Sequence, residues 1–302
     1  MPEKPPRISV VTPSYNRARF LEEAMLSVLD QGYPNLEYVI IDGGSTDGSV
    51  DIIRRYEDRL AYWVSEPDNG HGDALSKGFA KTGGEVMGWL NSDDLYTPWA
   101  FSVVAEIFSS FPQVEWISSV YPLMWNAAGQ AVACTPSGGF NRESFFRGAN
   151  LPSRGWYARE WIQQESTFWR RSLWERAGAW IDLSCTIAVD FELWTRFYDY
   201  ADLYGVAALI GGFRLHGDQK TTCRADEYLA EAEQMLQNAG GRPYGRLASI
   251  FRRAFSDIFA SRYPRVVLRP LGSRLARLGL LYPVEVCVWR GGKWEIVADH
   301  VV

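Results

Sequence analysis

The stretch VMGWLNSDDLYTP, residues 86–98, joins an apolar run to a pair of adjacent carboxylates. The run ends at Leu90, and Asp93 and Asp94 come directly after Asn91 and Ser92. Charged groups are costly to remove from water unless they find partners. Two acids at the end of a buried strand therefore raise the question of what they bind.

The segments before this stretch alternate between strand and helix patterns. RISVVTPSY (7–15) is rich in β-forming residues, and RARFLEEAMLSVLDQG (17–32) repeats apolar residues at helical spacing. The alternation continues with strands expected at 36–44, 60–67 and 85–91, and with helices expected at 49–59, 73–83 and 97–111. Such βαβ units predict an α/β fold with a mainly parallel sheet, whose ligands lie beyond the carboxyl ends of the strands.

The second half of the chain has a more mixed pattern. It predicts a strand at 114–125, a strand running into a helix at 164–178, a short helix at 190–200 and a strand at 206–217. A helical, arginine-rich segment begins at about Ala225. We therefore expect a large domain over residues 1–224 and a helical C-terminal extension over 225–302.

Composition and cysteine spacing point to a folded protein in a reducing compartment. The 302 residues are 47% hydrophobic and 22% charged, which is ordinary for a folded domain with a sizeable core. The cysteines, at positions 134, 185, 223 and 287, are too far apart in sequence for a metal knuckle or redox pair. The start, MPEKPPRISVV, does not resemble a signal peptide, and no apolar run approaches the ~20 residues of a membrane span. These features predict a cytoplasmic protein.

The net charge of −5 is unevenly distributed along the chain. Residues 245–284 carry +7, from eight arginines and one aspartate, against −12 on the rest. Interleaved with apolar residues, this segment could lie against an anionic membrane. It could equally be a solvated helical face whose arginine stems cover the acidic domain.

Three polar loops follow predicted strands: TPSYNR (12–17), DGGSTDGS (42–49) and NSDD (91–94). Neighbouring parallel strands would bring these loops to one rim of the sheet. The first loop has neither a Gly-x-Gly-x-x-Gly pattern nor a Walker lysine motif, which disfavours a dinucleotide dehydrogenase or a P-loop enzyme.

The order of these motifs resembles the family 2 glycosyltransferases, which have a nucleotide-sugar-binding, Rossmann-like GT-A fold. The motifs span roughly residues 7–217: SVVTPSYNR, LEYVIIDGGSTDGS, DNGHGDALSKG, GEVMGWLNSDD, QESTFWRR, DFELWTRF and FRLHG. The resemblance implies a nucleotide-sugar half over about 1–100 and an acceptor half over about 101–224.

The NSDD motif resembles the family's Asp-x-Asp signature, which holds a divalent metal on the donor diphosphate. A hard cation such as Mg²⁺ or Mn²⁺ neutralises charge developing on that leaving group. The resemblance makes Asp93 the main ligand, assisted by Asp94 and His216, with Asn91 in place of the first acid. Two alternatives remain: Asp94 could cap the following turn, and the tetrapeptide could be a turn without a metal.

The donor nucleotide is assigned by the same resemblance. Asp42 corresponds to the residue that reads the base, and a carboxylate can accept the imide N–H of uracil. The other implied nucleotide-binding residues are Thr12, Pro13 and Tyr15 beside the base, Arg17 at a phosphate, and Asp73, Lys77 and Ser92. The structural alternatives are an Asx turn at Asp42, helix capping by Ser45, Asp47 and Asp73, and an Asp73–Lys77 ion pair.

Attack by an acceptor hydroxyl opposite the leaving diphosphate inverts the anomeric carbon and needs a general base. Asp190 in VDFELW matches the family's base position, and a helix N-terminus favours its charged form. Glu192, two residues on, would face elsewhere on a helix. Gln164 and Glu165 lie where the family shapes the acceptor side.

The sequence thus predicts an inverting, metal-dependent transferase that moves sugar from a nucleotide diphosphate sugar, UDP-sugar first. Its acceptor would be a glycan or lipid-linked hydroxyl in polysaccharide or glycolipid biosynthesis. The protein would be cytoplasmic or peripheral at the inner membrane face, with no nucleic-acid partner. A degenerate nucleotide- or glycan-binding subunit is the alternative that Asn91 suggests. A nucleotidyltransferase is disfavoured because TPSYNR lacks the glycines that hold a triphosphate.

Overall fold

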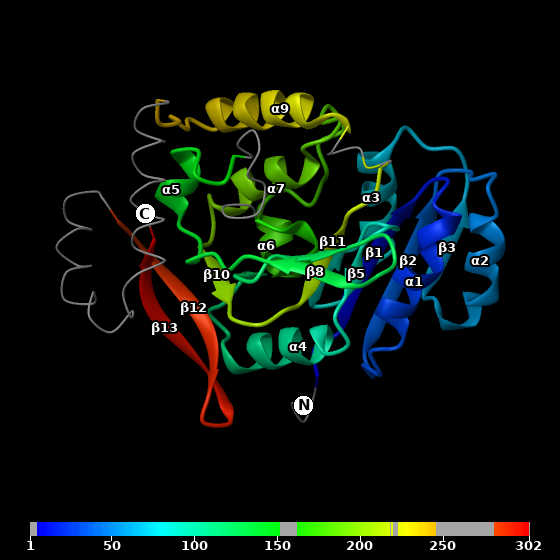
Figure 1. Ribbon diagram of the computed structural model, residues 1–302, viewed down its shortest axis with the longest axis horizontal. Coiled ribbons are helices and arrows are strands. Elements are labelled where there is room, and N and C mark those ends of the chain that lie inside the picture. The colour runs from blue at the N-terminus through cyan, green and yellow to red at the C-terminus, as the bar shows by residue number, and fades with distance from the viewer. Residues whose placement is uncertain (1–4, 152–161, 218, 220–222, 246–280, 302) are drawn as a thin grey trace.

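The computed structural model describes residues 5–151, 162–217, 219, 223–245 and 281–301. A nine-stranded mixed sheet forms its centre, in the order β13-β12-β10-β6-β9-β4-β1-β2-β3 (Figure 1). The strands are β1 (Ile8–Ser14), β2 (Leu36–Asp42), β3 (Tyr62–Ser65), β4 (Val86–Trp89), β6 (Trp116–Ser119), β9 (Phe168–Arg170), β10 (Leu203–Val206), β12 (Tyr282–Arg290) and β13 (Lys293–Val301). Five of these eight neighbouring pairs are parallel, so the expected mainly parallel sheet is confirmed.

Helices cover both faces of this sheet and enclose two apolar cores. One core contains residues of α1, α2 and α4, and the other contains residues of α3, α5, α6, α7 and α9. The helices are α1 (Ala18–Leu29), α2 (Ser49–Arg55), α3 (His71–Phe79), α4 (Ala100–Ser110), α5 (Arg142–Phe146), α6 (Arg171–Arg176), α7 (Val189–Phe197) and α9 (Ala225–Asn238), with 3₁₀ turns η1 (Glu57–Arg59) and η2 (Gln164–Ser166).

The central strands are apolar on both faces because both faces are covered. Val10 of β1 packs into the core under α1 and α4, whereas its neighbour Val11 packs into the core under α3. This alternation is the period-two geometry of a strand. At Gly78 of α3 an added Cβ would lie 2.3 Å from Val11 Cγ1, so only glycine allows this close approach of helix and strand.

A second, four-stranded sheet, β5-β11-β7-β8, positions the end of the NSDD loop. Its strands are β5 (Leu95–Tyr96), β7 (Leu123–Trp125), β8 (Ala131–Cys134) and β11 (Gly211–Arg214). Antiparallel pairing of β11 with β5 aligns Gly211 with Tyr96 and brings the FRLHG segment beside NSDD. A Cβ on Gly211 would meet Glu165 O at 2.2 Å, so η2 packs directly on this glycine.

The elements expected in the first half are confirmed in type and order. In the second half, two expected strands are each divided between the two sheets: 114–125 contributes to β6 and β7, and 206–217 contributes to β10 and β11. The strand β9 was expected, but it runs antiparallel between β4 and β6. The local hydrophobic pattern of a sequence predicts that a segment is a strand, but it does not predict whether the strand runs parallel or antiparallel to its neighbours.

The C-terminal extension is helical only in part. Ala225–Asn238 forms α9 as expected, but the prediction of helix for the final residues is wrong, because β12 and β13 form a hairpin that joins the main sheet beside β10 (Figure 1). Val284 and Val286 are buried while Glu285 between them is exposed, which is a strand pattern. Gly291 and Gly292 turn the hairpin at φ values of 55° and 84°, a conformation that favours glycine.

The prediction of a membrane-facing segment at 245–284 rests on arginines that lie outside the described residues. They are Arg246, Arg252, Arg253, Arg262, Arg265, Arg269, Arg274 and Arg277. Within the described part of the chain, no helix is both long enough and apolar enough to cross a bilayer.

Candidate functional site

The loops after β1 and β2 are tied together by hydrogen bonds. Asn16 N donates to Ser45 Oγ at 2.7 Å, and Thr46 N donates to Asn16 Oδ1 at 2.9 Å. Asn16 adopts a φ of 50°, which asparagine tolerates better than most residues. The adjoining Tyr15 is 60% exposed, so its ring is available to a ligand at this rim.

Asp42, at the end of β2, is fully buried and holds its own loop. Its Oδ2 accepts from Gly44 N, Ser45 N and Ser65 Oγ, and its Oδ1 accepts from Ser45 Oγ at 2.6 Å. This is the Asx-turn arrangement. Base recognition by Asp42 remains a prediction, and Oδ1, with one bond from the described residues, keeps one acceptor position for it.

The other predicted base-side residues differ in accessibility. Thr12 is buried and its hydroxyl pairs with Tyr38 Oη at 2.9 Å, and Pro13 is buried beside it. Only Tyr15 of this group projects outward. Any contact of Thr12 or Pro13 with a nucleotide would therefore be through the backbone or after a local opening.

Asp47 and Asp73 both accept hydrogen bonds from backbone N–H groups near helix starts. Asp47 accepts from Ala18 N at 2.9 Å and from Ser49 N at 3.1 Å, and so serves the first turns of α1 and α2 together. Asp73 accepts from Asn69 N at 3.0 Å, and this bond is the main cause of the lowered pKa of its carboxyl. Lys77 lies 3.4 Å from Asp73. The Asp73–Lys77 ion pair and the role of Asp47 at two helix starts are therefore observed. Asp73 binds Asn69 N just before α3 and does not cap it, and Ser45 Oγ accepts from Asn16 N instead of capping a helix. Contact of Asp73 or Lys77 with ribose or diphosphate remains a prediction.

Asp93 lies at the centre of a polar cluster at the end of β4. Its Oδ2 is 3.2 Å from Arg17 Nε and 3.1 Å from His216 Nε2, and the His216 ring stacks on Phe20 at a centroid distance of 4.5 Å. Burial tends to raise the pKa of Asp93, but the His216 hydrogen bond and the Arg17 charge together hold it below its usual value. Asp93 is therefore a carboxylate at neutral pH, with a cation and an imidazole beside it.

Asp94 points away from this cluster into the protein. Its Oδ1 accepts from Arg214 N at 2.8 Å, and its Oδ2 accepts from Asn91 Nδ2 at 3.0 Å. Asp94 is 1% exposed, and the preceding Ser92 is also buried. Asp94 thus fastens β11 to the NSDD turn, which is what brings His216 to Asp93.

Asn91, which stands where the Asp-x-Asp signature has its first aspartate, forms hydrogen bonds that hold the NSDD turn. Its Nδ2 also approaches Gln164 Oε1 at 3.3 Å, and Gln164 Nε2 donates to Trp89 O at 2.6 Å. An amide can donate to Asp94 and Gln164, whereas a carboxylate could only accept. Gln164, expected on the acceptor side, is buried here and closes the end of β4.

Glu165 is buried, and its carboxyl is affected by the charges of both Asp93 and Asp190. Burial raises the pKa of its carboxyl to about 7, and the charges of Asp190 and Asp93 add to this effect. Its Oε2 has no hydrogen-bond partner among the described residues. Burial likewise raises the pKa of the neighbouring Asp94, with Glu165 and Asp93 contributing. Such a close carboxyl pair retains a proton near neutrality.

Asp190 occupies the first turn of α7 and is bound from another helix. Tyr228 Oη on α9 lies 3.0 Å from Oδ1 and 3.2 Å from Oδ2 of Asp190. Burial raises the pKa of Asp190 to about 6, although hydrogen bonds from Phe191 N and Tyr228 oppose the rise. Glu192 faces elsewhere, as expected, and binds the Arg196 guanidinium at 2.7 Å. Tyr228 carries no motif that would mark it in the sequence.

The donor set at Asp93 suits a hard cation that shares its shell with phosphate. The described residues contain no cluster of three His, Cys, Asp or Glu side chains spaced for a metal. Asp93 and His216 nevertheless offer one carboxylate and one imidazole within 3.1 Å of each other. Mg²⁺ is commonly held by one or two carboxylates plus substrate phosphates, and Mn²⁺ accepts similar oxygen ligands. The residues present therefore fit such a metal.

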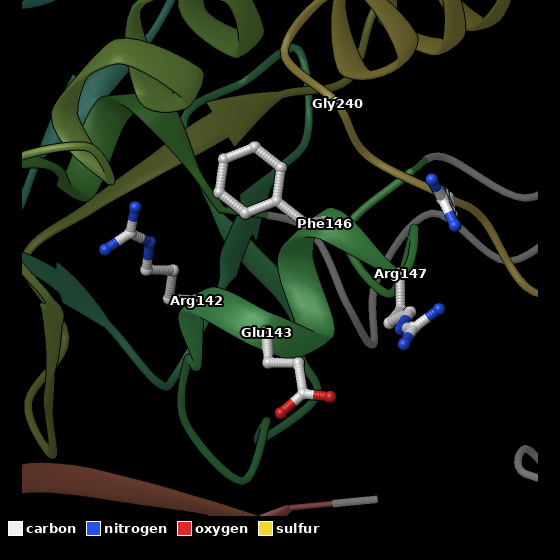
Figure 2. Close-up of a pocket in the computed structure, with 6 residues that line it drawn as sticks. Arg142, Glu143, Phe146, Arg147 and Gly240 are labelled. Atoms are coloured by element: carbon white, nitrogen blue, oxygen red, sulfur yellow. The ribbon is translucent and has the colours of Figure 1, made fainter.

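A hollow of about 440 Å³ lies elsewhere, between α5 and the chain after α9 (Figure 2). No predicted site residue lines it; the lining residues are Arg142, Glu143, Phe146, Arg147, Gly240 and Arg242. Figure 2 shows the Arg142, Glu143 and Arg147 side chains pointing in different directions from α5. They do not converge on one ligand position, so this hollow is not part of the candidate site.

The mainly parallel sheet flanked by helices, with polar loops at its strand ends, is a GT-A fold. TarS of S. aureus (residues 1–349, in complex with UDP-GlcNAc) superimposes with a TM-score of 0.57 at 16% identity, over 91% of this chain and 78% of that one. Glucosyl-3-phosphoglycerate synthase from Mycobacterium tuberculosis (with Mn²⁺, UDP and phosphoglyceric acid) gives 0.55 at 18% identity, over 80% of each chain. At these identities the likeness establishes the fold, and the predicted GT-A fold is confirmed.

Residues 9–121 match the family model described as glycosyl transferase family 2. An uncharacterized glycosyltransferase of Rickettsia prowazekii is 26% identical over 76% of this chain and 70% of its own length. A putative teichuronic acid biosynthesis glycosyltransferase of Bacillus subtilis, TuaG, is 39% identical over 30% of this chain and 36% of its own length. Over residues 9–121 the chain is therefore similar to the family 2 glycosyltransferases. It spans about a third of the length of the curated relatives that it matches at 36–39% identity.

Proposed function

We propose that this protein transfers a sugar from a nucleotide diphosphate sugar to an acceptor hydroxyl, with inversion at the anomeric carbon. The observation that carries the proposal is the position of Glu165. Its pKa responds to the charges of both Asp93 and Asp190, which are far apart in sequence. The predicted diphosphate-side acid and the predicted base are therefore both close enough to one buried carboxyl for their charges to act on it.

The donor side is built around Asp93. Arg17 supplies a fixed positive charge to a diphosphate at this rim, and the exposed Tyr15 ring offers a surface for the base. Asp93 and His216 are the residues that would hold a divalent cation, Mg²⁺ or Mn²⁺, which when bound neutralises charge on the leaving diphosphate. UDP is the nucleotide we propose first, because the TarS structures contain UDP or UDP-GlcNAc and Asp42 could accept from uracil.

The acceptor side is built around Asp190. Its carboxylate takes the proton of the attacking hydroxyl, and a pKa of about 6 leaves it mostly ionised at neutral pH. The elevated pKa makes it a stronger base than an ordinary aspartate, while proton transfer remains possible in the physiological range.

The acceptor class and location are extensions of the same proposal. TuaG is named for teichuronic acid biosynthesis, and this supports a cell-envelope polysaccharide or a lipid-linked glycan as acceptor. The four cysteines are free thiols in the structure, which agrees with a reducing cytoplasmic setting. Peripheral binding to an anionic membrane through residues 245–284 is part of the proposal and is tested with liposomes at low salt.

The first test is a thermal-shift screen of the purified chain against UDP, GDP, CDP and dTDP, each with and without Mn²⁺. A ligand at 100 times its Kd stabilises a protein by about 2.7 kcal/mol. We expect a UDP shift that requires Mn²⁺ and disappears in Asp93→Ala. The matched control, Asp51→Ala on the exposed face of α2, should keep the shift, because Asp51 contacts only Arg54 among the described side chains.

Turnover then separates an enzyme from a degenerate binding subunit. Donor hydrolysis should be measurable with the UDP-sugar that gives the largest shift, and Asp190→Asn should remove it while keeping the UDP shift. Nucleotide binding with no turnover by wild type would support the binding-subunit alternative. The absence of any nucleotide shift would contradict the proposed donor site.

A further inference from the structure

Helix α9 contacts the segment that carries Asp190 through two residues three positions apart. Tyr228 donates to the Asp190 carboxylate, at 3.0 Å from Oδ1 and 3.2 Å from Oδ2. Glu231, on nearly the same face of the helix, reaches the residues just before α7. Figure 1 shows α9 lying along one side of the domain, across α7.

Glu231 binds the turn that immediately precedes α7 through both of its carboxylate oxygens. Its Oε1 accepts from Thr186 N at 2.9 Å and Thr186 Oγ1 at 2.6 Å, and its Oε2 accepts from Ile187 N at 2.9 Å and Ala188 N at 2.8 Å. Although burial opposes the charge, these bonds lower the pKa of Glu231. These three N–H groups belong to the turn that leads into α7, so a carboxylate from a distant helix fixes the chain just before Val189.

The same face of α9 is anchored in the core. Tyr228, Ala232 and Leu236, spaced four residues apart, are buried in the apolar cluster that also contains Phe191 and Trp194 of α7. Packing in this cluster therefore fixes the position of the Tyr228 ring, and so the position from which its hydroxyl binds Asp190. This arrangement restricts both the rotamer of Asp190 and the start of its helix.

We propose that Tyr228 and Glu231 form a clasp that positions Asp190: Tyr228 orients the carboxylate, and Glu231 fixes the turn from which it projects. The claim that the clasp positions a general base rests on the proposed function. The claim that Tyr228 and Glu231 fix the Asp190 carboxyl and set its pKa can be tested without any substrate.

The two members of the clasp act on Asp190 with opposite electrostatic sign. The Tyr228 hydroxyl stabilises the carboxylate, whereas the negative charge of Glu231 destabilises it. Among the described residues, Glu165 of η2 is a further titratable group whose pKa is raised by the charge of Asp190. Removing the Tyr228 hydroxyl should therefore raise the pKa of Asp190, and neutralising Glu231 should lower it.

The test is a ¹³C NMR titration of protein labelled at the aspartate carboxyl carbon, with Asp190→Asn assigning the signal. The wild-type midpoint is expected at about pH 6. In Tyr228→Phe, which keeps the buried ring, we expect the midpoint to rise by about one pH unit, the equivalent of a lost hydrogen bond to a charged group. In Glu231→Gln we expect it to fall by several tenths of a unit.

Two controls remove the same chemical groups from neighbouring positions. Tyr244→Phe loses a hydroxyl that pairs with Tyr282, and Glu227→Gln loses an exposed charge on α9 that pairs with Arg224. Both should leave the Asp190 midpoint unchanged. The clasp would be overturned if the Asp190 titration midpoint moved in the same direction in Tyr228→Phe and Glu231→Gln, or if it moved in neither variant. If Tyr228→Phe does not fold, the downward shift in Glu231→Gln still decides it.

Kinetics distinguish failure of the clasp from failure of the proposed function. With an active UDP-sugar donor, Tyr228→Phe should move the acidic limb of the kcat profile upward by the same pH interval as the titration. Its donor KM should stay within about twofold of wild type, because Tyr228 and Glu231 lie on α9, whereas the Asp93 cluster is formed by the loops after β1, β4 and β11. Full activity in Asp190→Asn would remove the proposed base, while the titration would still report on the clasp.

Discussion

Replacing Asp190 by asparagine is expected to abolish transfer and, at the same time, to stabilise the fold. Asp190 has a folded-state pKa of about 6 against an ordinary value of 3.8, mainly because of burial. The folded protein therefore holds this proton to higher pH than the unfolded chain does. Asparagine has a similar shape and still offers an oxygen to the Tyr228 hydroxyl, but it needs no ionisation.

The magnitude and its pH dependence follow from the two pKa values. Between pH 3.8 and about 6 the folded state binds more protons than the unfolded state, so stability falls as pH rises through this window. At 1.36 kcal/mol per pH unit, ionised Asp190 costs about 3 kcal/mol above pH 7 and about half of that at pH 5. Since asparagine accepts a weaker bond from Tyr228, we expect a net gain of about 1 to 3 kcal/mol at pH 7.5.

The assay is thermal unfolding of wild type and Asp190→Asn at pH 7.5 and pH 5. The gain should appear as a rise in Tm of about 2 to 6 °C at pH 7.5 and should shrink markedly at pH 5. The control Asp51→Asn changes an 81%-exposed side chain and should shift Tm by less than about 1 °C at either pH. A destabilised Asp190→Asn, or a gain that is the same at both pH values, would refute this account of the Asp190 environment.

Three further outcomes follow from individual contacts. Gly78→Ala should destabilise the fold by about 1 to 3 kcal/mol in urea unfolding, because the new Cβ would lie 2.3 Å from Val11 Cγ1; little change would mean that α3 can move away. Glu37→Ala should cost about 2 kcal/mol or more, since it removes the acceptor of the Ser9 hydroxyl and of Gly83 N and leaves Gly84 N only its bond to Ser9 Oγ; a cost below 1 kcal/mol would contradict that network. His216→Gln should weaken the Mn²⁺ dependence of UDP binding about tenfold in a Mn²⁺ titration with Tm nearly unchanged; an unaltered titration would exclude His216 as a metal ligand.

The donor half could be predicted because its information is local. Val10 and Val11, adjacent in sequence, pack into opposite cores, and the continuous apolar run of β1 announces a strand covered on both faces. Consecutive βα units place their strand-end loops at one rim, so the neighbourhood of Arg17 and Asp93 follows from chain order and the observed 3.2 Å contact agrees with it.

The strands and the turn of the C-terminal hairpin could have been predicted from the sequence. The helix prediction for these residues was wrong because it extended the pattern of the preceding arginine-rich segment to the end of the chain. The alternation around Glu285 and the Gly291–Gly292 pair are strand and turn signals in the sequence itself. Its partner strand, β10, could not be predicted in the same way. Pairing of residues about eighty positions apart depends on which sheet edge the rest of the fold leaves open.

The two sides of the candidate site are therefore built by different means, and this has a consequence for how they respond to mutation. The donor side depends on loops fixed by neighbouring strands, with His216 brought in by the bond between Asp94 and Arg214 N. The base side depends on the contact of α9 with α7. These two helices are distant in sequence and pack in the same apolar core. Because Tyr228 and Glu231 lie on α9, whereas the Asp93 cluster lies on the loops after β1, β4 and β11, nucleotide binding and base ionisation should be separable. Variants of α9 should move the pH profile at constant donor affinity, and variants around Asp93 should do the reverse.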